Sequence, residues 1–495
     1  MRLRITALAL AVVLAGVAWQ LPQLRRRLLH DVTHWDAAPS DPAAIPGGAG
    51  PGLAPVAHTR VILIDGLSAE VAAGLPAWQA LCGRGTQAMV DVGFPTVSLP
   101  IEVALWSGLT QQQTGIVNRY ERPLVPALHG IPSQVPGSWA VAENHGWIVR
   151  SLGFAITEPA ADPAHPVADA APEPWRGLWL ARATAAVTSS ARLVFVHVLA
   201  VDTAGHDHGG DSAEYRAAAA AADQTLAGLV GAAPDARWFL LSDHGHLPGG
   251  GHGGEEREVR QVQGCLVGPG IAVRKAGLVH LVDISRALAD SVGIALDPAS
   301  RGRPLDAALA HPLAPDEALP AMTLGDGAVA ILVLAVGFAL TILAARAWWL
   351  APWWFVLGCL ALVMLRGEPT LSEPYVYRPA GRDMYLIWLP LLALAFAATW
   401  FGTRRTTLVR VAVAQLALPF AAAATALTAS GAWPAVLGAE VAPVVPRFTA
   451  YTSPLLLMAS HGAAAVALAA LARFVRLGFG RPARPGPPRT APSTG

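Results

Sequence analysis

Five long apolar runs in the last part of the chain constrain its fold more than any other feature. They lie near residues 327–345, 348–365, 384–402, 409–430 and 453–472. Each is about as long as a helix must be to cross ~30 Å of hydrocarbon at ~1.5 Å per residue. Charged residues are only 14% of the 495, against roughly 25% in soluble proteins. A wholly soluble chain is therefore excluded, and we expect a five-helix transmembrane domain over 320–478.

The two ends of the chain differ from its middle in composition and charge. Residues 1–30 contain no acid and carry an apolar run at 5–21, which predicts a signal anchor or a cleaved signal peptide. Residues 479–495 are rich in Pro, Arg and Gly, which predicts a disordered cytoplasmic tail. The middle, 31–319, holds 29 acidic and 17 basic residues. The net charge of +1 therefore hides a segregation of charge, and nothing in it suggests a nucleic-acid partner.

The arginines orient the predicted spans. If the N-terminus is cytoplasmic, most arginines of the C-terminal part fall on the inner side, as the positive-inside rule expects. The domain at 31–319 is then extracytoplasmic, although the run at 25–27 is a misfit on the outer side. Lys275 is the only lysine, and this Arg-rich, Ala-rich composition favours a bacterial chain. We therefore expect a multi-pass protein of the bacterial inner membrane, in contact with membrane lipids, whose larger domain faces the periplasm.

The middle domain has the pattern of an α/β protein. Short apolar runs at 60–64, 193–200, 238–241 and 262–267 alternate with Ala-rich helical stretches at 213–230 and 283–292. This alternation predicts a mostly parallel sheet flanked by helices, with functional residues at the carboxyl ends of the strands. The segment 121–173 is rich in Pro and Ala without a clear period, and we expect it to be an insertion or cap beside the site. The three cysteines form no recognisable framework.

Three of the apolar runs end in an aspartate with histidines close behind. Asp65 follows Ile64, Asp202 precedes His206, and Asp243 precedes His244 and His252. Converging carboxylates repel one another unless a cation lies between them. Mixed carboxylate and imidazole ligands suit zinc, and six of them are too many for one tetrahedral ion. We therefore expect two divalent cations, with zinc favoured and other divalent metals left open.

A hydroxyl-bearing turn supplies a candidate nucleophile. Gly93 to Pro100 contains Thr96 and Ser98 and precedes an expected helix. A hydroxyl at such a turn can be ionised by a metal beside a helix N-terminus that suits phosphate oxygens. We rank Thr96 first and Ser98 second, with a helix-capping role as the alternative for Thr96. His208 and His246, in glycine-rich surroundings, are interpreted as solvated loop residues, with a role in supporting the metal ligands or in contacting substrate as the alternative.

Taken in order, these motifs resemble the alkaline phosphatase superfamily. The resemblance rests on the Asp65 motif, Phe94-Pro95-Thr96, Asp202-x-x-x-His206, Ser242-Asp243-His244 and Gly251-His252-Gly253-Gly254. The run from Gly108 to Asn118 is similar to type I phosphodiesterases and nucleotide pyrophosphatases. The Gly-His-Gly-Gly element and the apolar C-terminal part are similar to GPI ethanolamine-phosphate transferases. The resemblance covers about residues 58–308.

The resemblance implies two zinc ions and a nucleophile. The first zinc would be held by Asp65, Thr96, Asp243 and His244, and the second by Asp202, His206 and His252. Thr96 would attack phosphorus, and water or an acceptor alcohol would then take the phosphoryl group. Ile101 stands where the phosphodiesterase branch has a phosphate-binding asparagine, and Asn118 is the substitute we find.

Three functions remain open from the sequence. The first is a phosphodiesterase or phosphatase that acts on a phosphoester with water. The second is a phosphoethanolamine-type transferase acting on a lipid-linked glycan, favoured by the apolar C-terminal part. The third is a membrane scaffold or transporter with a degenerate enzyme domain, which the full ligand set disfavours. The sequence says nothing about oligomeric state.

Overall fold

The computed structural model of the chain divides into two compact units. One comprises 1–29, 322–369 and 381–495, and the other 30–321 and 370–380. The residues that the structure describes are 2–33, 52–114, 116, 130–160, 173–254, 256–313, 324–339, 346, 348–366, 372, 380–402, 407, 410, 421, 424 and 445–478.

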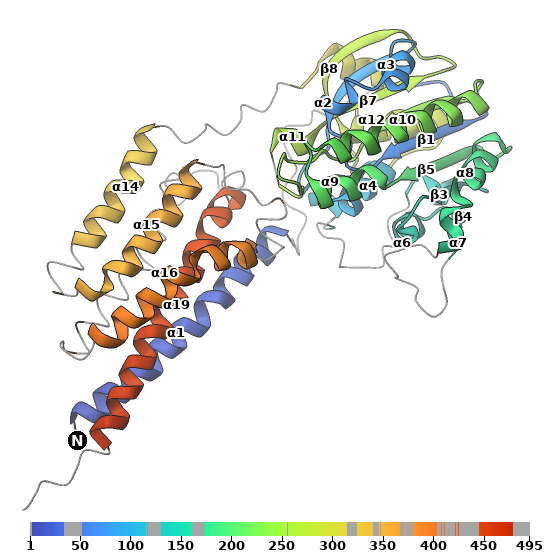
Figure 1. The fold of residues 1–495 in the computed structure, drawn as a ribbon. Coiled ribbons are helices and arrows are strands. Elements are labelled where there is room, and N and C mark those ends of the chain that lie inside the picture. Colours follow the sequence, from blue (N-terminus) through green and yellow to red (C-terminus); the bar gives the residue numbers. More distant parts are fainter. Residues whose placement is uncertain are drawn as a thin grey trace, which may run out of the picture. The chain divides into compact units, whose positions relative to one another are not determined.

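The larger unit is built on a mixed sheet in the order β4-β3-β5-β1-β6-β7-β2-β8 (Figure 1). The strands are β1 (Thr59–Ile64), β2 (Thr86–Asp91), β3 (Trp139–Ala142), β4 (Ile156–Glu158), β5 (Leu193–Val198), β6 (Arg237–Leu241), β7 (Gln261–Val267) and β8 (Arg274–His280). Among these described strands only β7 runs antiparallel to its neighbours, β6 and β2. The prediction of a mostly parallel sheet flanked by helices is thus confirmed.

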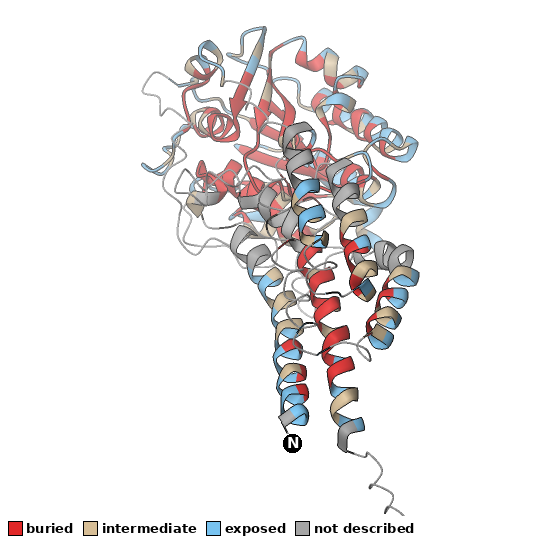
Figure 2. Cartoon of the chain, turned by 90° about the vertical axis from the view of Figure 1, so that its left-hand side faces the viewer, coloured by how far each residue is buried: buried red, intermediate tan, exposed pale blue. Residues whose placement is uncertain are grey.

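Helices cover both faces of this sheet (Figure 2). They are α2 (Ala69–Ala72), α3 (Pro76–Cys82), α4 (Ser98–Ser107), α5 (Gln111–Thr114), α6 (Gly146–Ser151), α7 (Glu173–Arg176), α8 (Trp179–Thr188), α9 (Ala200–His208), α10 (Ala213–Ala232), α11 (Arg257–Arg260), α12 (Leu281–Val292) and α13 (Leu305–Ala310), with a short 3₁₀ turn η1 (Pro132–Gln134). Helices α4 and α12 pack on one face, while α3, α8 and α10 pack on the other.

The central strands are apolar on both faces because both faces are covered. In β1, Val61 and Leu63 pack with α4 and α12, whereas Ile62 and Ile64 pack with α3, α8 and α10. All six residues of β1 are buried. A strand buried on both faces shows a continuous apolar run instead of alternation, which is the pattern seen in the sequence.

The segment 121–173 corrects one expectation. Its described part, 130–160, contributes β3 and β4, and β3 pairs in parallel with β5. These strands extend one edge of the main sheet, so this part is not a cap. The strands are short, four and three residues, which left no readable period in the sequence. The remaining residues of the segment, apart from α7, lie outside the described residues.

A disulfide joins α3 to β7. It links Cys82 to Cys265, with the two Cα atoms 5.3 Å apart and a sequence separation of 183. Both cysteines are buried in the same apolar layer. The sequence did not show this pairing because the two positions are far apart along the chain.

The other unit consists of apolar helices. They are α1 (Arg2–Thr33), α14 (Leu324–Ala339), α15 (Ala351–Arg366), α16 (Ala380–Gly402) and α19 (Val445–Gly478), with a 3₁₀ turn η3 (Trp348–Leu350). Four of the five predicted spans lie largely in these helices. In the span 409–430 the described residues, 410, 421 and 424, are helical as well, while the rest of that span and all of 479–495 lie outside the described residues.

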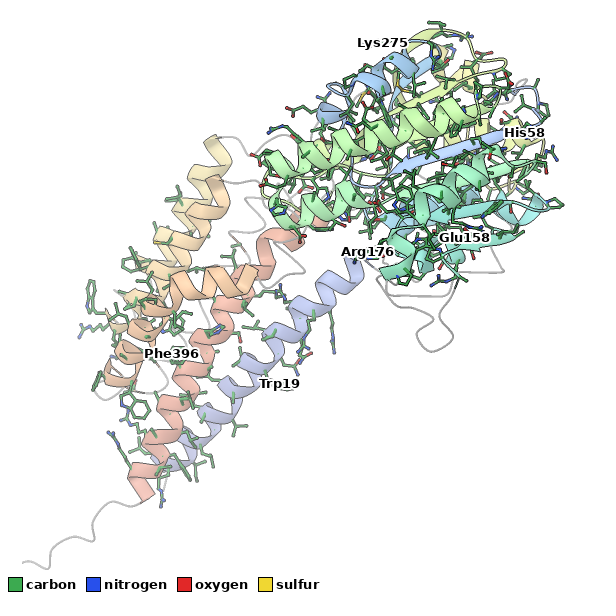
Figure 3. All side chains as sticks on the ribbon, turned by 45° about the vertical axis from the view of Figure 1, so that its right-hand side comes forward. Trp19, His58, Glu158, Arg176, Lys275 and Phe396 are labelled. Carbon is green, nitrogen blue, oxygen red and sulfur yellow. A yellow bond between two sulfur atoms is a disulfide. The ribbon has the colours of Figure 1, made fainter. Side chains whose placement is uncertain are left out.

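Two helical segments in the described part of the chain are long and apolar enough to cross a membrane. They are Leu3–Arg27 and Leu455–Arg476. The two helices that contain them pack together, and Ser460 Oγ donates to the carbonyl of Ala18 at 2.7 Å. Large apolar side chains on α1 are exposed, including Trp19 at 69% (Figure 3). These helices support membrane association, whereas the five-helix transmembrane bundle stays a prediction.

Candidate metal centre

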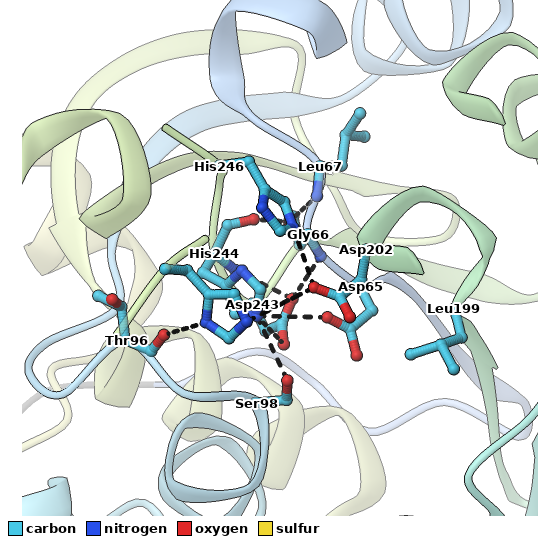
Figure 4. A network of polar contacts seen from close by, with 12 residues as sticks. Asp65, Gly66, Leu67, Thr96, Ser98, Leu199, Asp202, Asp243, His244 and His246 are labelled. Atoms are coloured by element: carbon cyan, nitrogen blue, oxygen red, sulfur yellow. Dashed lines mark hydrogen bonds and ion pairs between the residues drawn. The ribbon is translucent and has the colours of Figure 1, made fainter. Parts of the chain in front are cut away.

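Three adjacent strands bring the three aspartates together. Strands β5, β1 and β6 are neighbours in the sheet and run in parallel, so their carboxyl ends meet at one edge. Asp65 directly follows β1, Asp243 lies two residues after β6, and Asp202 lies in the first turn of α9 after β5. The expected convergence of these carboxylates at the strand ends is what the structure shows (Figure 4).

The first group of candidate ligands, which we term the inner cluster, comprises Asp65, Asp243 and His244. His244 Nε2 lies 3.3 Å from Asp65 Oδ1 and 3.4 Å from Asp243 Oδ2. All three side chains are fully buried. Within the described residues, neither oxygen of Asp65 nor Oδ2 of Asp243 has a well-formed hydrogen bond. Buried carboxylate oxygens without donors, facing an imidazole nitrogen, fit a cation.

The backbone orients the carboxylate of Asp243. Its Oδ1 accepts hydrogen bonds from the amides of Gly66 at 3.0 Å and His244 at 2.9 Å. Oδ2 therefore faces the inner cluster. Gly66 has φ +72°, and a Cβ there would lie 2.8 Å from the Cα of Asp202. Only glycine allows the chain to pass this closely, which explains the Asp-Gly pair after β1.

The second group, the outer cluster, comprises Asp202, His206, His246 and His252. His246 Nε2 lies 2.9 Å from Asp202 Oδ1, and His206 Nε2 lies 3.5 Å from the same oxygen. His252 Nε2 lies 3.1 Å from His206 Nε2 and 3.6 Å from Asp202 Oδ1. The two clusters adjoin, since the rings of His244 and His252 stack with centroids 3.6 Å apart.

His246 was missed by the sequence interpretation. The structure buries it to 3% exposure and points it at Asp202 (Figure 4), whereas we expected a solvated loop residue. Its glycine-rich surroundings suggested an open loop, but those glycines allow close packing, since a Cβ at Gly205 would lie 2.4 Å from the His246 ring. His208 is exposed, as expected.

The pKa values show that these groups suit a cation. Burial, followed by the nearby Asp243 and Asp202 carboxylates, raises the pKa of Asp65 well above its usual range. Burial also raises the pKa of Asp243 to about 6 and lowers the pKa of His244 to about 3. Imidazoles held neutral and carboxylates in mutual repulsion are the state that a divalent cation stabilises.

The outer cluster differs in its charge balance. Burial alone would raise the pKa of Asp202, but the hydrogen bond with His246 and the nearby His206 and His252 outweigh it and hold that pKa well below its usual value. Burial, and then His244, lowers the pKa of His252 well below its usual value. A carboxylate that stays ionised, together with several imidazoles, is again a ligand set suited to zinc.

The two candidate hydroxyls occupy different places. Thr96 is fully buried, and its Oγ1 donates to the carbonyl of Gly254 at 2.8 Å and accepts from the amide of Gly253 at 2.9 Å. Ser98 is half-buried at the N-terminus of α4, and its Oγ lies 3.3 Å from His244 Nε2. The structure therefore brings the Ser98 hydroxyl, our second choice, to the inner cluster. It ties the Thr96 hydroxyl to the backbone of Gly253 and Gly254 in the loop at 252–254.

Two further side chains behind the inner cluster were not predicted. His197 Nε2 lies 3.2 Å from Asp65 Oδ2 and 3.1 Å from Glu102 Oε1, and all three residues are fully buried. A side chain behind a metal ligand fixes its orientation. His197 lies within the apolar β5 and Glu102 within the apolar α4. An isolated polar residue in an apolar element was the signal available, and their pairing depends on the fold.

Glu143 and Tyr215 support the two clusters from outside. Glu143 Oε2 accepts hydrogen bonds from the amides of Leu199 at 2.7 Å and Ala200 at 2.9 Å, and thus caps the start of α9. The Tyr215 hydroxyl donates to the carbonyl of Gly66 and accepts from the amide of Ser68 at 2.8 Å. Asn118, the expected phosphate-binding substitute, lies outside the described residues.

An α/β sheet with carboxylate and imidazole clusters at adjacent strand ends defines a candidate metal-dependent enzyme. The family model for type I phosphodiesterase / nucleotide pyrophosphatase matches residues 155–262, which contain the whole outer cluster together with Asp243 and His244. This match confirms the resemblance to that branch. The similarity to GPI ethanolamine-phosphate transferases stays a prediction.

Several solved structures are also similar to this chain. Murine ectonucleotide pyrophosphatase/phosphodiesterase 5 is 13% identical, with 49% of this chain and 96% of that chain covered and a TM-score of 0.38. A protein of the alkaline phosphatase superfamily from Vibrio parahaemolyticus is 14% identical, with 59% and 79% covered and a TM-score of 0.36. No curated protein sequence matches this chain.

Proposed function

We propose that the chain is a metal-dependent phosphodiesterase whose inner and outer clusters each hold one divalent cation. The observation that carries the proposal is the buried inner cluster, where carboxylate oxygens without hydrogen bonds face both an imidazole and a reachable serine hydroxyl. The family match over 155–262 supports phosphoryl-transfer hydrolysis. Zinc is the favoured cation because both clusters mix histidine with carboxylate.

Asp65, Asp243 and His244 would hold the inner cation, and Asp202, His206, His246 and His252 would offer ligands to the outer one. When bound, such a pair of cations stabilises the attacking and leaving oxygens of an in-line displacement. The protein itself supplies their orientation. Gly66 and His244 amides fix Asp243, and His197 and Glu102 lie behind Asp65.

We place the nucleophile at Ser98 instead of Thr96. Ser98 is half-buried and lies at the inner cluster, whereas Thr96 is fully buried and its hydroxyl proton is donated to the carbonyl of Gly254. A bond would form between Ser98 Oγ and phosphorus as the bond to the leaving oxygen breaks, and the serine proton would leave with the alcohol. Water would then cleave the phosphoserine, which releases the phosphomonoester and restores the hydroxyl.

The nucleophile can be tested with two variants on a chromogenic diester such as bis(p-nitrophenyl) phosphate. Ser98→Ala should lower kcat roughly 10³-fold or more, whereas Thr96→Ser, which keeps the hydroxyl bonds to the loop, should stay within about tenfold of wild type. Mass spectrometry of acid-quenched enzyme should find the phosphoryl group on Ser98. A phosphothreonine at Thr96 would refute this assignment and restore our first choice.

The location of the enzyme is part of the proposal. The candidate spans on α1 and α19 and the exposed apolar side chains of α1 support a membrane-bound protein. The buried disulfide supports an oxidising compartment, here the periplasmic side of a bacterial inner membrane. In spheroplasts, an impermeant protease should therefore cleave the larger unit. Protection of that unit until the membrane is lysed would contradict this orientation.

A transferase is the second candidate, favoured by the apolar helices α14, α15 and α16, which a simple anchor does not require. In that case an alcohol on a lipid-linked glycan, not water, would take the phosphoryl group from Ser98. Steady release of product from a diester without any added lipid acceptor supports hydrolysis. A single burst of one product per enzyme, followed by turnover only when a lipid acceptor is added, would support the transferase.

A further inference from the structure

One residue from the C-terminal third of the chain lies within the catalytic unit. Ser372 lies in the sequence between the apolar helices α15 and α16, yet the segment 370–380 belongs to the α/β unit. Its side chain is fully buried. The Ser372 hydroxyl accepts a hydrogen bond from the amide of Gly254 at 2.9 Å and donates to Glu256 Oε2 at 2.8 Å.

Gly254 connects Ser372 to the residues before the nucleophile. The carbonyl of Gly254 accepts the hydrogen bond from Thr96 Oγ1, and the preceding amide of Gly253 donates to that same hydroxyl. The carbonyl of Thr96 in turn lies 2.7 Å from His252 Nδ1. The loop at 252–254 thus holds both a histidine of the outer cluster and the turn that leads to Ser98.

The contact at Gly254 is close. A Cβ at this position would lie 2.7 Å from Ser372 Oγ and 2.2 Å from Glu256 Oε2, so a larger residue here would displace both side chains from the loop. Because an amide buried without a partner is destabilised, the Gly254 N–H depends on Ser372 for its hydrogen bond. Loss of the Ser372 hydroxyl would therefore remove a hydrogen bond that holds the loop at 252–254.

We propose that Ser372 is a positioning residue for the phosphodiesterase site, acting through the loop at 252–254 on His252 and Ser98. This inference rests on the proposed function for its catalytic consequence. It goes further in assigning part of the site to the segment between two apolar helices. Ser372 therefore acts on the site from a position in the sequence between α15 and α16.

A double-mutant cycle on the full-length protein in detergent tests this contact. Ser372→Ala and Glu256→Ala should each lower kcat about tenfold with KM unchanged, since neither side chain lies among the candidate metal ligands and the hydrogen bonds they lose hold the loop. The double variant should lose little more than the worse single variant, because both remove the same clamp. If the kcat loss of the double variant equals the product of the two single losses, or if the variants raise only KM, the proposal is overturned.

Ser460→Ala is the matched control. It also removes a buried serine hydroxyl from the C-terminal third, one that bonds to Ala18 within the helical unit. It should leave kcat unchanged. When it is combined with Glu256→Ala, the loss in kcat should equal that of Glu256→Ala alone. Coupling of Ser460 to Glu256 as strong as that of Ser372 would show a general loss of integrity and overturn the assignment.

Metal affinity provides a readout that does not depend on turnover. Competition with a chromogenic zinc chelator should show the outer cation bound about tenfold more weakly in Ser372→Ala, with the inner cation retained. If wild type hydrolyses no diester yet this selective loss appears, the positioning role stands and the proposed function falls. Equal affinities in wild type and Ser372→Ala would refute the positioning role even in an active enzyme.

Discussion

The inner and outer clusters lie side by side but are built in different ways. The inner cluster has two carboxylates and one histidine, all fully buried behind strands β1 and β6. The outer cluster has one carboxylate and three histidines, carried by helix α9 and by loops, and His206 is partly exposed. The inner cluster therefore concentrates carboxylates in a fully buried site, whereas the outer cluster is richer in histidine and closer to solvent. The inner cation should therefore depend more strongly on its carboxylates.

The largest expected effect comes from removing one inner carboxylate. Asp243→Asn keeps the shape but removes the charge and a ligand oxygen. We expect zinc content to fall from two equivalents to one and kcat to fall roughly 10³-fold or more, because Ser98 loses the cation beside it. Elemental analysis and diester hydrolysis measure both. His206→Ala, on the exposed side of the outer cluster, should cost less, about 10²-fold, and the reverse order would contradict the comparison.

Supporting carboxylates allow each cluster to be weakened separately. Glu102→Gln removes the charge behind His197 and Asp65 and should weaken the inner cation about 10- to 100-fold. Glu143→Gln, the matched control, weakens the cap of α9 and should affect only the outer cation. Chelator competition on both variants distinguishes the sites. If both variants weaken the same cation, the two clusters are not supported independently.

Acid should release the inner cation first. Because burial raises the pKa of Asp243 to about 6, protons compete for this ligand as the pH falls through 6, and inner affinity should drop about tenfold per pH unit below it. Asp202 has a lowered pKa, as does His252, so these outer ligands stay deprotonated to lower pH. The protein can be loaded with cobalt in place of zinc. The amount of bound cobalt, measured by its visible spectrum from pH 8 to pH 4.5, should then fall in two steps. In His252→Ala, the step at lower pH should disappear, and its persistence would assign the steps the other way.

The smallest effect is expected at Tyr215. Tyr215→Phe removes the hydroxyl that bonds to Gly66 and Ser68 beside the inner cluster. A buried carbonyl and amide would lose their partner, which costs about 1–3 kcal/mol in the free energy of unfolding. The melting temperature should fall while inner affinity changes only about threefold. Thr188→Ala, which removes an exposed hydroxyl on α8, should not change either value. Loss of the inner zinc in Tyr215→Phe would contradict this expectation. It would show that the inner cluster depends strongly on the loop at 66–68 that Tyr215 holds.

The sequence predicted the ligands that follow strands and missed those that depend on packing. The sequence could predict that Asp65, Asp202 and Asp243 lie close together, because parallel strands have their carboxyl ends at one edge of the sheet. The burial of His246 depends on the approach of Gly205, and Glu102 meets His197 only because α4 packs over β5. The different surroundings of the Thr96 and Ser98 hydroxyls depend on the direction of each side chain, which a turn motif does not specify. Strands β3 and β4 were too short to show a period, and the Cys82–Cys265 pair spans 183 residues.

The close approach at Gly66 has a consequence for how this site can evolve. The main chain at Gly66, after β1, passes the Cα of Asp202 with no space for a Cβ. The distance between the two clusters is therefore fixed by a contact between two backbone segments. Exchange of ligand side chains can then alter which cation is preferred and how tightly it is held. The spacing of the two clusters remains constant through such exchanges. Divergence in substrate choice should therefore arise around the site, in the segments that surround the leaving group.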